Sequence, residues 1–297
     1  MGSAGVESFT VDGSYRITVG LPYGAPGPAG YRPLYVLDGD VYFGSALELV
    51  RASHRLKDVL VVGVGYPRER RFVRRILGAG PVQRPPWLAD VPLHVVAREK
   101  RRVFDFTSPV TSRELGRNGL DKLLDVDSDA VGGVEAFSDA LESCIRSAVD
   151  RRFPVDYRVG TLFGHSFAGL AALHILFTRP HSWRTFLISS PSIWWSGRAV
   201  LHHERMLRKS AAKVRVCLTV GRLEGAQVES QGYSVQLRRS IARARMYDNS
   251  LELARRLRRY PNVELAWEAF GGVAHDSAPW SALSRGVPFA FRATSPK

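Results

Sequence analysis

The chain has 297 residues, 45% of them hydrophobic, and a formal net charge of +14 at pH 7. This length and apolar content are sufficient for one sizeable core, and α/β folds of this size often form one domain. No run of 18 apolar residues is present, which excludes a helix that crosses a membrane. We therefore expect a single domain over residues 1–297, with no membrane partner.

Arginine supplies almost all of the excess positive charge, since the chain contains only six lysines. Such a composition reflects either the base composition of a genome or attraction to an anionic substrate. The arginines do not form a stripe interleaved with aromatic residues, so we expect no nucleic-acid partner. Residues 1–7 lack the basic and apolar regions of a signal peptide, which predicts a cytoplasmic protein. Cys144 and Cys217 lie in apolar patterns and are interpreted as buried thiols.

Strand patterns dominate the first part of the chain. Apolar and polar residues alternate from Ser8 to Leu21 around an Asp12-Gly13 turn, which predicts an antiparallel hairpin. Residues 22–33 are rich in glycine and proline, as is typical of a loop. Leu34–Leu37 and Val59–Val64 are short apolar runs, which favours two buried strands.

Helical and strand patterns alternate in the second part of the chain. Residues 134–153 have helical periodicity, and a second helix is predicted over 251–260. Short apolar runs predict four further strands, over 159–163, 185–188, 214–220 and 263–270. Apolar strands that alternate with helices predict an α/β fold, with a mostly parallel central sheet and helices on both of its faces.

Two long stretches, 78–98 and 113–133, match no regular element. The first holds four prolines, and the second is rich in glycine and aspartate. Loops of this length are uncommon in a compact domain unless they are functional or disordered. We interpret both as candidate lid insertions or a partner surface, and the alternative is a pair of disordered insertions.

The segment Gly164-His165-Ser166-Phe167-Ala168-Gly169 follows one apolar run and precedes an apolar helical pattern. A strand, a sharp turn and a helix, with serine at the apex, are typical of a nucleophile elbow. Because strand and helix pass close together, the residues two before and two after the serine must be small. Gly164 and Ala168 meet this demand, although glycine is usual at both positions. Ser166 is therefore the candidate nucleophile, and the alternative is an ordinary glycine-rich turn.

A serine nucleophile needs a base, usually a histidine that a carboxylate orients. In α/β hydrolases the acid and then the histidine follow the serine along the chain, each after a strand. Among the eight histidines only His275 follows the last predicted strand, so it is the candidate base. Glu224 follows the strand over 214–220 and is the candidate acid, with Glu229 and Asp248 as alternatives.

An oxyanion hole requires two backbone N–H donors. We expect one from Phe167, the residue after the serine, and the other from Gly39 or Asp40, in the turn after the strand at 34–37. A glycine at this turn leaves room for a substrate carbonyl to approach the backbone. This chemistry uses neither a metal nor a cofactor, so we expect none.

Seven segments in chain order carry a family resemblance: Tyr35–Asp40, Val62–Pro67, Arg101–Pro109, Gly132–Phe137, Pro154–Arg158, Gly164–Gly169 and Ile188–Trp195. Together they resemble the putative-esterase group of α/β hydrolases, which contains the salmochelin, enterochelin and ferri-bacillibactin esterases. The resemblance implies an α/β-hydrolase fold and a serine esterase that cuts catecholate trilactone siderophores. It also implies that Arg101 and Arg102 contact an anionic substrate.

The sequence thus predicts a serine esterase that acts on a small-molecule carboxylic ester through an acyl-enzyme. One alternative is an acyltransferase on the same scaffold, in which an alcohol or an amine replaces water. A second alternative is a non-catalytic binding protein for an anionic ligand. The order of Ser166 and His275 along the chain favours an enzyme.

Overall fold

The computed structural model describes residues 5–80, 82, 90–111, 130–225 and 242–292. Its strands join one eight-stranded sheet in the order β1-β2-β4-β3-β5-β6-β7-β8. The strands are β1 (Val6–Val11), β2 (Tyr15–Gly20), β3 (Arg32–Leu37), β4 (Val59–Gly65), β5 (Thr161–His165), β6 (Thr185–Ser189), β7 (Val214–Gly221) and β8 (Val263–Phe270).

Only the first strands of the sheet run antiparallel. β1 pairs with β2, and β2 with β4, in the antiparallel sense, whereas every pair from β4 through β3 to β8 is parallel. The predicted N-terminal hairpin and the mostly parallel sheet are therefore confirmed. The single sheet takes strands from both ends of the chain, and the single domain over residues 1–297 stays a prediction.

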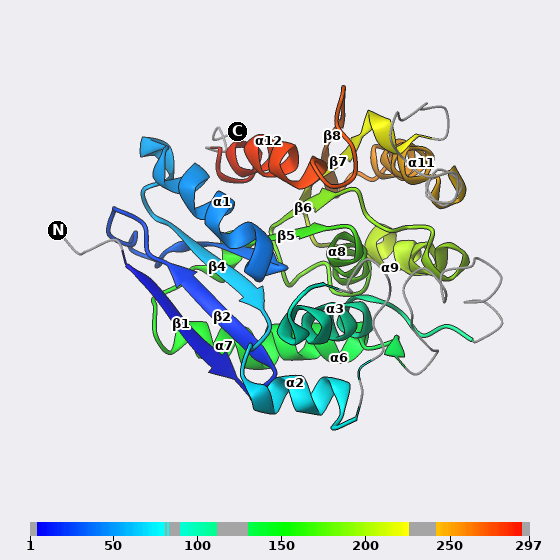
Figure 1. Cartoon of the computed structure of the whole chain (residues 1–297). Helices are drawn as coiled ribbons and strands as arrows, with labels where there is room; N and C mark the ends of the chain where they lie inside the picture. The colour runs from blue at the N-terminus through cyan, green and yellow to red at the C-terminus, as the bar shows by residue number, and fades with distance from the viewer. Residues whose placement is uncertain (1–4, 81, 83–89, 112–129, 226–241, 293–297) are drawn as a thin grey trace.

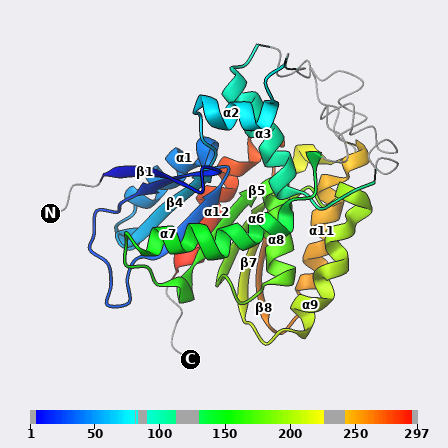
Figure 2. The same cartoon turned by 90° about the horizontal axis from the view of Figure 1, so that it is seen from below.

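Helices cover both faces of the sheet (Figure 1). α1 (Gly39–Arg51) and α12 (Ala278–Phe291) lie on one face. The opposite face carries α3 (Leu93–Phe106), α6 (Val134–Asp139), α7 (Arg146–Asp150), α8 (Phe167–Thr178), α9 (Glu204–Lys209) and α11 (Met246–Leu257). In the view from below, α6, α7 and α8 lie in front of the strands and α12 behind them (Figure 2).

The two cores explain the apolar strand sequences. Successive side chains of β3 alternate, so Leu34 and Val36 pack under α1 and α12, whereas Tyr35 and Leu37 pack on the other face. A strand covered on both faces buries every residue, as β4 and β5 do. This is why these strands appear in the sequence as continuous apolar runs.

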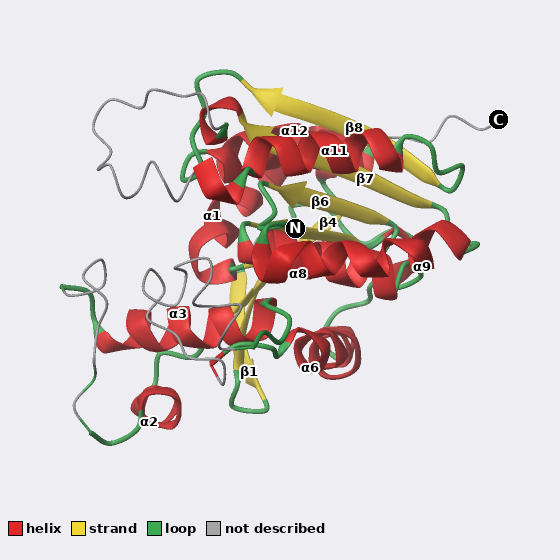
Figure 3. Cartoon of the chain, turned by 90° about the vertical axis from the view of Figure 1, so that its right-hand side faces the viewer, coloured by secondary structure: helices red, strands yellow, loops and turns green. Residues whose placement is uncertain are grey.

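The stretch 78–98 was expected to lack regular structure, and this is wrong for its last residues. Residues 93–98 begin α3, whose buried side chains include Val96, Val103 and Phe106. α3 packs beside α2 (Arg70–Leu77), at the end of the molecule far from α11 and α12 (Figure 3). Residues 81, 83–89 and 112–129 lie outside the described residues, and the hypothesis of lid insertions there stays a prediction.

The predicted helix over 134–153 is present as α6, the π-helical turn η4 (Ala140–Ile145) and α7. Both cysteines are free thiols. Cys217 in β7 is buried, but Cys144 is partly exposed, so the prediction of a buried thiol is wrong for Cys144. Within the described ranges, no helix is both long enough and apolar enough to span a membrane.

Candidate active site

Ser166 lies at the junction of β5 and α8, as the elbow motif predicts. Its backbone has φ 59° and ψ −120°, a conformation that a residue with a side chain rarely adopts. The neighbouring turn holds this conformation, because the Ser166 N–H donates to the Ser189 carbonyl and the Ser192 N–H donates to the Ser166 carbonyl, each at 3.1 Å. The strain is thus maintained by hydrogen bonds from the loop that follows β6.

The close approach of strand and helix restricts Gly164. A Cβ atom built on Gly164 would lie 2.2 Å from the carbonyl oxygen of Ala168, closer than such atoms can approach. The size limit at position 168 is less strict than at position 164, because the carbonyl of Ala168 and not its side chain faces Gly164. Ala168, in the first turn of α8, is fully buried and belongs to the core cluster on this face of the sheet, so its methyl group packs with other apolar side chains.

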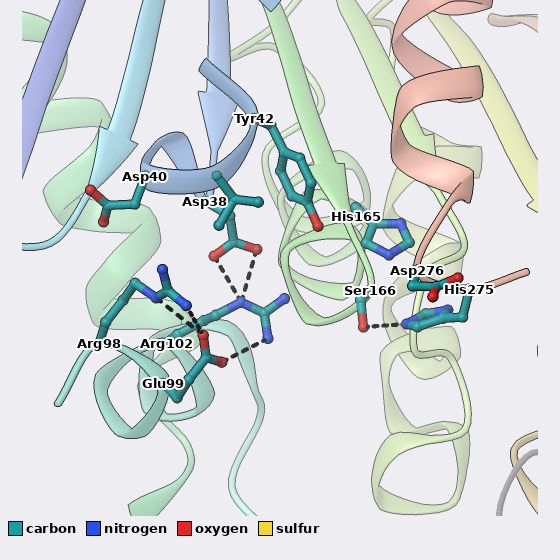
Figure 4. A pocket seen from close by; sticks show the side chains of 11 residues that line it. Asp38, Asp40, Tyr42, Arg98, Glu99, Arg102, His165, Ser166, His275 and Asp276 are labelled. Carbon is teal, nitrogen blue, oxygen red and sulfur yellow. Dashed lines mark hydrogen bonds and ion pairs between the residues drawn. The ribbon is translucent and has the colours of Figure 1, made fainter. Parts of the chain in front are cut away.

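Ser166, His275 and Glu224 form one chain of hydrogen bonds. His275, in the turn after β8, places Nε2 3.0 Å from the Ser166 Oγ (Figure 4). Its Nδ1 lies 2.6 Å from Oε2 of Glu224, which belongs to the short helix η7 (Arg222–Glu224) after β7. The structure therefore brings together the three residues that the sequence predicts for a triad.

Glu224 is oriented by two further donors. Its Oε1 accepts hydrogen bonds from the Gly221 N–H at 2.8 Å and the Ser190 hydroxyl at 2.6 Å, which directs Oε2 toward His275. The carboxylate is only 2% exposed, whereas the side chain of His275 is 45% exposed. The Leu223 N–H donates to the Val273 carbonyl. This hydrogen bond connects the turn that carries Glu224 to the loop that carries His275.

The alternative acids are placed differently. Asp248 lies in α11, where its carboxylate is 3.3 Å from the guanidinium of Arg245. Glu229 lies outside the described residues. His174, interpreted as a packed residue of the elbow helix, is indeed buried in α8, with Nε2 2.8 Å from Glu135.

Three serines at the end of β6 and just after it support the candidate triad, and the sequence alone assigned them no role. Ser189 and Ser192 bond to the elbow backbone, and Ser190 bonds to Glu224. Ser190 is buried with φ 41°, a left-handed conformation that is uncommon for serine. The run Ser189-Ser190-Pro191-Ser192 at the end of a predicted strand, beside the elbow in a parallel sheet, is the signal that identifies them.

The candidate oxyanion donors lie at the starts of two helices. Gly39 and Asp40 are the first residues of α1, and Phe167 is the first residue of α8. The first N–H groups of a helix have no partner within it, and they favour negative charge. Both helix N-termini are therefore suited to bind an oxyanion near Ser166.

Glycine is required at position 39 for a reason other than the one expected. A Cβ atom there would lie 2.6 Å from the backbone of Gly63, so it would collide with β4 and not with a substrate. The carboxylate of Asp40 is turned away from an approaching ester, because it accepts the Tyr66 N–H at 2.7 Å and pairs with Arg16. Only the backbone of Asp40 is thus available as a donor.

A pocket of about 280 Å³ opens over Ser166. The serine and His275 lie on one side of it, and a group of charged residues lies on the other (Figure 4). Besides these two, its lining consists of Asp38, Asp40, Val41, Tyr42, Arg98, Glu99, Arg102, His165 and Asp276. Within the described parts of the chain, no group of three or more histidine, cysteine or acidic residues is arranged to hold a metal ion.

The two predicted substrate-binding arginines have different surroundings. Arg102 lines the pocket, but its Nε donates to both carboxylate oxygens of Asp38, at 2.7 and 2.8 Å. Burial raises the pKa of Asp38 above its ordinary value, and the charge of Arg102 opposes this rise. The Nε–H of Arg102 is therefore engaged with Asp38, and its Nη1 lies 3.9 Å from Glu99.

Arg101 is not among the described residues that line the pocket, and its contact with substrate stays a prediction. It pairs with Asp105 at 2.9 Å and donates to the Tyr15 hydroxyl at 3.2 Å. Asp105 is 1% exposed, and burial raises its pKa to about 6. Neighbouring helix residues face directions that differ by about 100°, and the side chain of Arg101 is directed to Asp105 and Tyr15 while that of Arg102 reaches Asp38.

Comparisons with known proteins agree with this fold. The family model described as Putative esterase matches residues 99–280. The siderophore enterobactin esterase of Emericella nidulans is 30% identical over 301 residues, which cover 94% of this chain and 89% of the relative. The ferri-bacillibactin esterase BesA of Bacillus subtilis is 26% identical over 300 residues, which cover 95% of this chain and 86% of the relative.

A solved structure extends the likeness to three dimensions. The siderophore hydrolase EstA of Aspergillus nidulans superposes with a TM-score of 0.75 at 26% identity, covering 97% of this chain and 95% of the other. The protein is a carboxylic ester hydrolase of the α/β-hydrolase fold. It belongs to the Putative esterase family.

Proposed function

We propose that this protein is a serine esterase in which Ser166 is the nucleophile, His275 the general base and Glu224 the acid. The unbroken chain of hydrogen bonds from the Ser166 Oγ through His275 to Glu224 carries the proposal. Each link has the heavy-atom distance that proton transfer within such a triad requires.

The reaction proceeds in two halves. The Ser166 Oγ attacks the ester carbonyl while its proton passes to Nε2 of His275. The oxyanion of the tetrahedral intermediate accepts hydrogen bonds from the Phe167 N–H and from the N–H of Gly39 or Asp40. His275 then protonates the departing alcohol, and an acyl-enzyme on Ser166 remains. In the second half His275 removes a proton from water, which attacks the acyl-enzyme and releases the acid.

Glu224 controls the histidine in both halves. Its carboxylate accepts the Nδ1–H of His275, which leaves Nε2 unprotonated and directed at the serine. The negative charge also stabilises the imidazolium that forms when His275 takes the serine's proton. The Ser190 hydroxyl and the Gly221 N–H hold the carboxylate in this orientation.

The substrate we propose is an ester-linked siderophore of the catecholate trilactone type. The names of two relatives that cover most of the chain specify enterobactin and ferri-bacillibactin as their substrates. The pocket opens to solvent beside an exposed histidine, so a bulky ester can reach the serine. Acyl transfer to an alcohol or amine uses the same acyl-enzyme, and the nature of the acceptor distinguishes the two activities.

A labelling experiment tests the chemistry, and a substrate screen tests the specificity. A fluorophosphonate should label the wild-type protein at Ser166 and should not label Ser166→Ala, because only an activated serine reacts. The screen compares cyclic catecholate trilactones with simple aryl esters, with and without added alcohol acceptor. Absence of labelling would overturn the serine mechanism, and hydrolysis of aryl esters alone would overturn the siderophore specificity.

A further inference from the structure

The turn that supplies Gly39 and Asp40 begins with a strained residue. Asp38 has φ 52° and ψ 42°, a left-handed conformation, and it directly precedes the first residue of α1. Non-glycine residues keep such a conformation only where the surroundings impose it. The direction of the next two N–H groups depends on this dihedral pair, so whatever holds Asp38 also aims the candidate oxyanion donors.

Arg102 is the group that holds the Asp38 side chain. Its Nε lies 2.7 and 2.8 Å from the two carboxylate oxygens, and the two side chains are only 14% and 5% exposed. A charge-assisted contact of this kind between buried partners has few alternative arrangements. α3 is therefore connected to the start of α1 by one well-defined pair.

The same guanidinium also contacts the second donor residue. Its Cζ lies 5.8 Å from the ring centroid of Phe167, the first residue of α8, and 5.8 Å from that of Phe106. Phe167 is 6% exposed, so its ring is enclosed. Arg102 thus contacts Asp38 at the start of α1 and Phe167 at the start of α8. An ester carbonyl would bind between these two helix N-termini.

The geometry points to Arg102 as a positioning residue that aligns both halves of the oxyanion hole. It acts through Asp38 on the N–H groups of Gly39 and Asp40, and through the ring of Phe167 on the remaining N–H. This inference rests on the proposed serine mechanism. It differs from the predicted role of Arg102 as a binder of substrate anions, because the contact with Asp38 directs the guanidinium to the start of α1.

The test separates kcat from KM on two esters. Arg102→Lys keeps the charge but loses the Nε contact, and it should lower kcat about 10- to 100-fold on both a neutral aryl ester and an anionic ester. KM should change by less than about two-fold on the neutral ester, because that ester offers no charge to bind. A rise in KM for the anionic ester alone, with kcat unchanged, would overturn the inference in favour of direct binding.

Arg101→Lys is the matched control. It lies on the same helix and also pairs through its guanidinium with a buried aspartate, Asp105, but it does not line the pocket. Both variants lose a comparable buried contact, so their unfolding temperatures should fall together. Only Arg102→Lys should lose kcat, and an equal loss in both variants would show that the effect is structural.

A double-mutant cycle covers the case in which Arg102→Lys folds poorly. Asp38→Asn preserves the shape of the side chain, and the cycle combines it with Arg102→Gln. If Arg102 acts through Asp38, the double variant should be no slower than the slower single variant, whereas multiplied losses would overturn the inference.

Fluorophosphonate labelling of the wild-type protein distinguishes failure of the serine mechanism from failure of the role of Arg102. Without labelling the serine mechanism itself fails, and with labelling but unaffected variants only the role of Arg102 fails.

Discussion

The imidazole of His165 lies against that of His275, with ring centroids 4.7 Å apart and planes inclined by 39°. His165 is buried, and its Nδ1 is 3.1 Å from the Ser189 hydroxyl. Burial, aided by the positive charges of its neighbours, lowers the pKa of His165 well below its ordinary value of 6.5. The neutral ring of His165 therefore lies against His275, the base we propose. A positive charge on His165 would oppose formation of the imidazolium of His275.

His165→Gln should change how stability depends on pH. In the wild type, the unfolded chain binds a proton at this histidine below pH 6.5 and the folded protein does not, so stability is lost as pH falls below that value. Stability that His165 contributes is thus fully present above pH 6.5. Relative to the variant, the wild-type free energy of unfolding should fall by about 1.4 kcal/mol per pH unit below this point. Urea titrations at several pH values measure it.

His174→Gln is the control for that experiment. Burial also lowers the pKa of His174, but this residue lies in the interior of α8 and does not line the pocket. The His174→Gln variant should change the pH dependence of stability in the same direction as His165→Gln, and its kcat should stay close to the wild-type value. A loss of kcat in both variants would contradict a specific role for His165 beside the base.

Ser166→Ala should reduce ester hydrolysis by about three orders of magnitude or more, because the members of a triad act as a unit. Folding should be retained, since alanine loses only the hydroxyl and the backbone contacts to Ser189 and Ser192 do not involve the side chain. Steady-state kinetics and thermal unfolding measure the two effects. A variant with near-wild-type activity would exclude Ser166 as the nucleophile.

Glu224→Gln should lower kcat by about 10³- to 10⁴-fold with little change in KM. An amide cannot accept hydrogen bonds from Ser190, Gly221 and His275 as the carboxylate does, so the histidine loses its orientation. Glu268→Gln, at a 40% exposed glutamate paired with Arg285, is the control and should retain activity. Equal activity of the two variants would remove Glu224 from the triad.

Gly164→Ala should destabilise the protein by about 3 kcal/mol or more, because its Cβ would overlap the Ala168 carbonyl and neither backbone can move easily. Gly44→Ala is the matched control in α1, where a Cβ meets no atom within 4 Å. This control should gain about 0.5–1 kcal/mol from helix propensity. Denaturant titration of both variants checks the difference, and similar stabilities would contradict the close packing of the elbow.

Arg98→Gln should raise KM several-fold for an anionic ester and leave a neutral aryl ester unaffected. Arg98 lines the pocket and pairs with Glu99 at 2.7 Å, on a side chain that is 25% exposed. Its charge is thus closer to solvent than that of Arg102, and added salt should weaken its effect. KM values for both esters at two salt concentrations test this, and a salt-independent effect would argue against charge recognition.

The strands, Ser166 and His275 were predictable because their signals are local. Short apolar runs mark the buried strands, and Ser166 and His275 each follow such a run at the position that an elbow or a catalytic loop occupies. Glu224 was predicted only with Glu229 and Asp248 as alternatives, since the sequence does not indicate which carboxylate after β7 turns inward. The contacts of Ser190 and of Asp38 with Arg102 join elements far apart in the chain, and no local pattern encodes them.

Helix α12 was not predicted, and its sequence explains why. It contains Pro288 in its interior and Gly286, two residues that disfavour a helix in isolation. Packing overrides this preference, because Gly286 lies close against Leu187 of β6. A Cβ atom built on Gly286 would be 3.1 Å from the methyl carbons of Leu187. A bulkier residue there would press α12 away from the sheet.

The hydrogen bond between Ser166 and His275 joins residues 109 positions apart. A ribosome that adds about 5–20 residues per second therefore finishes the elbow roughly 5–20 s before it adds the histidine. During that interval the nascent chain carries a serine without its base. In the mechanism we propose, hydrolysis requires His275, which follows β8, so recovery of activity after refolding should report that the loop after β8 has reached Ser166.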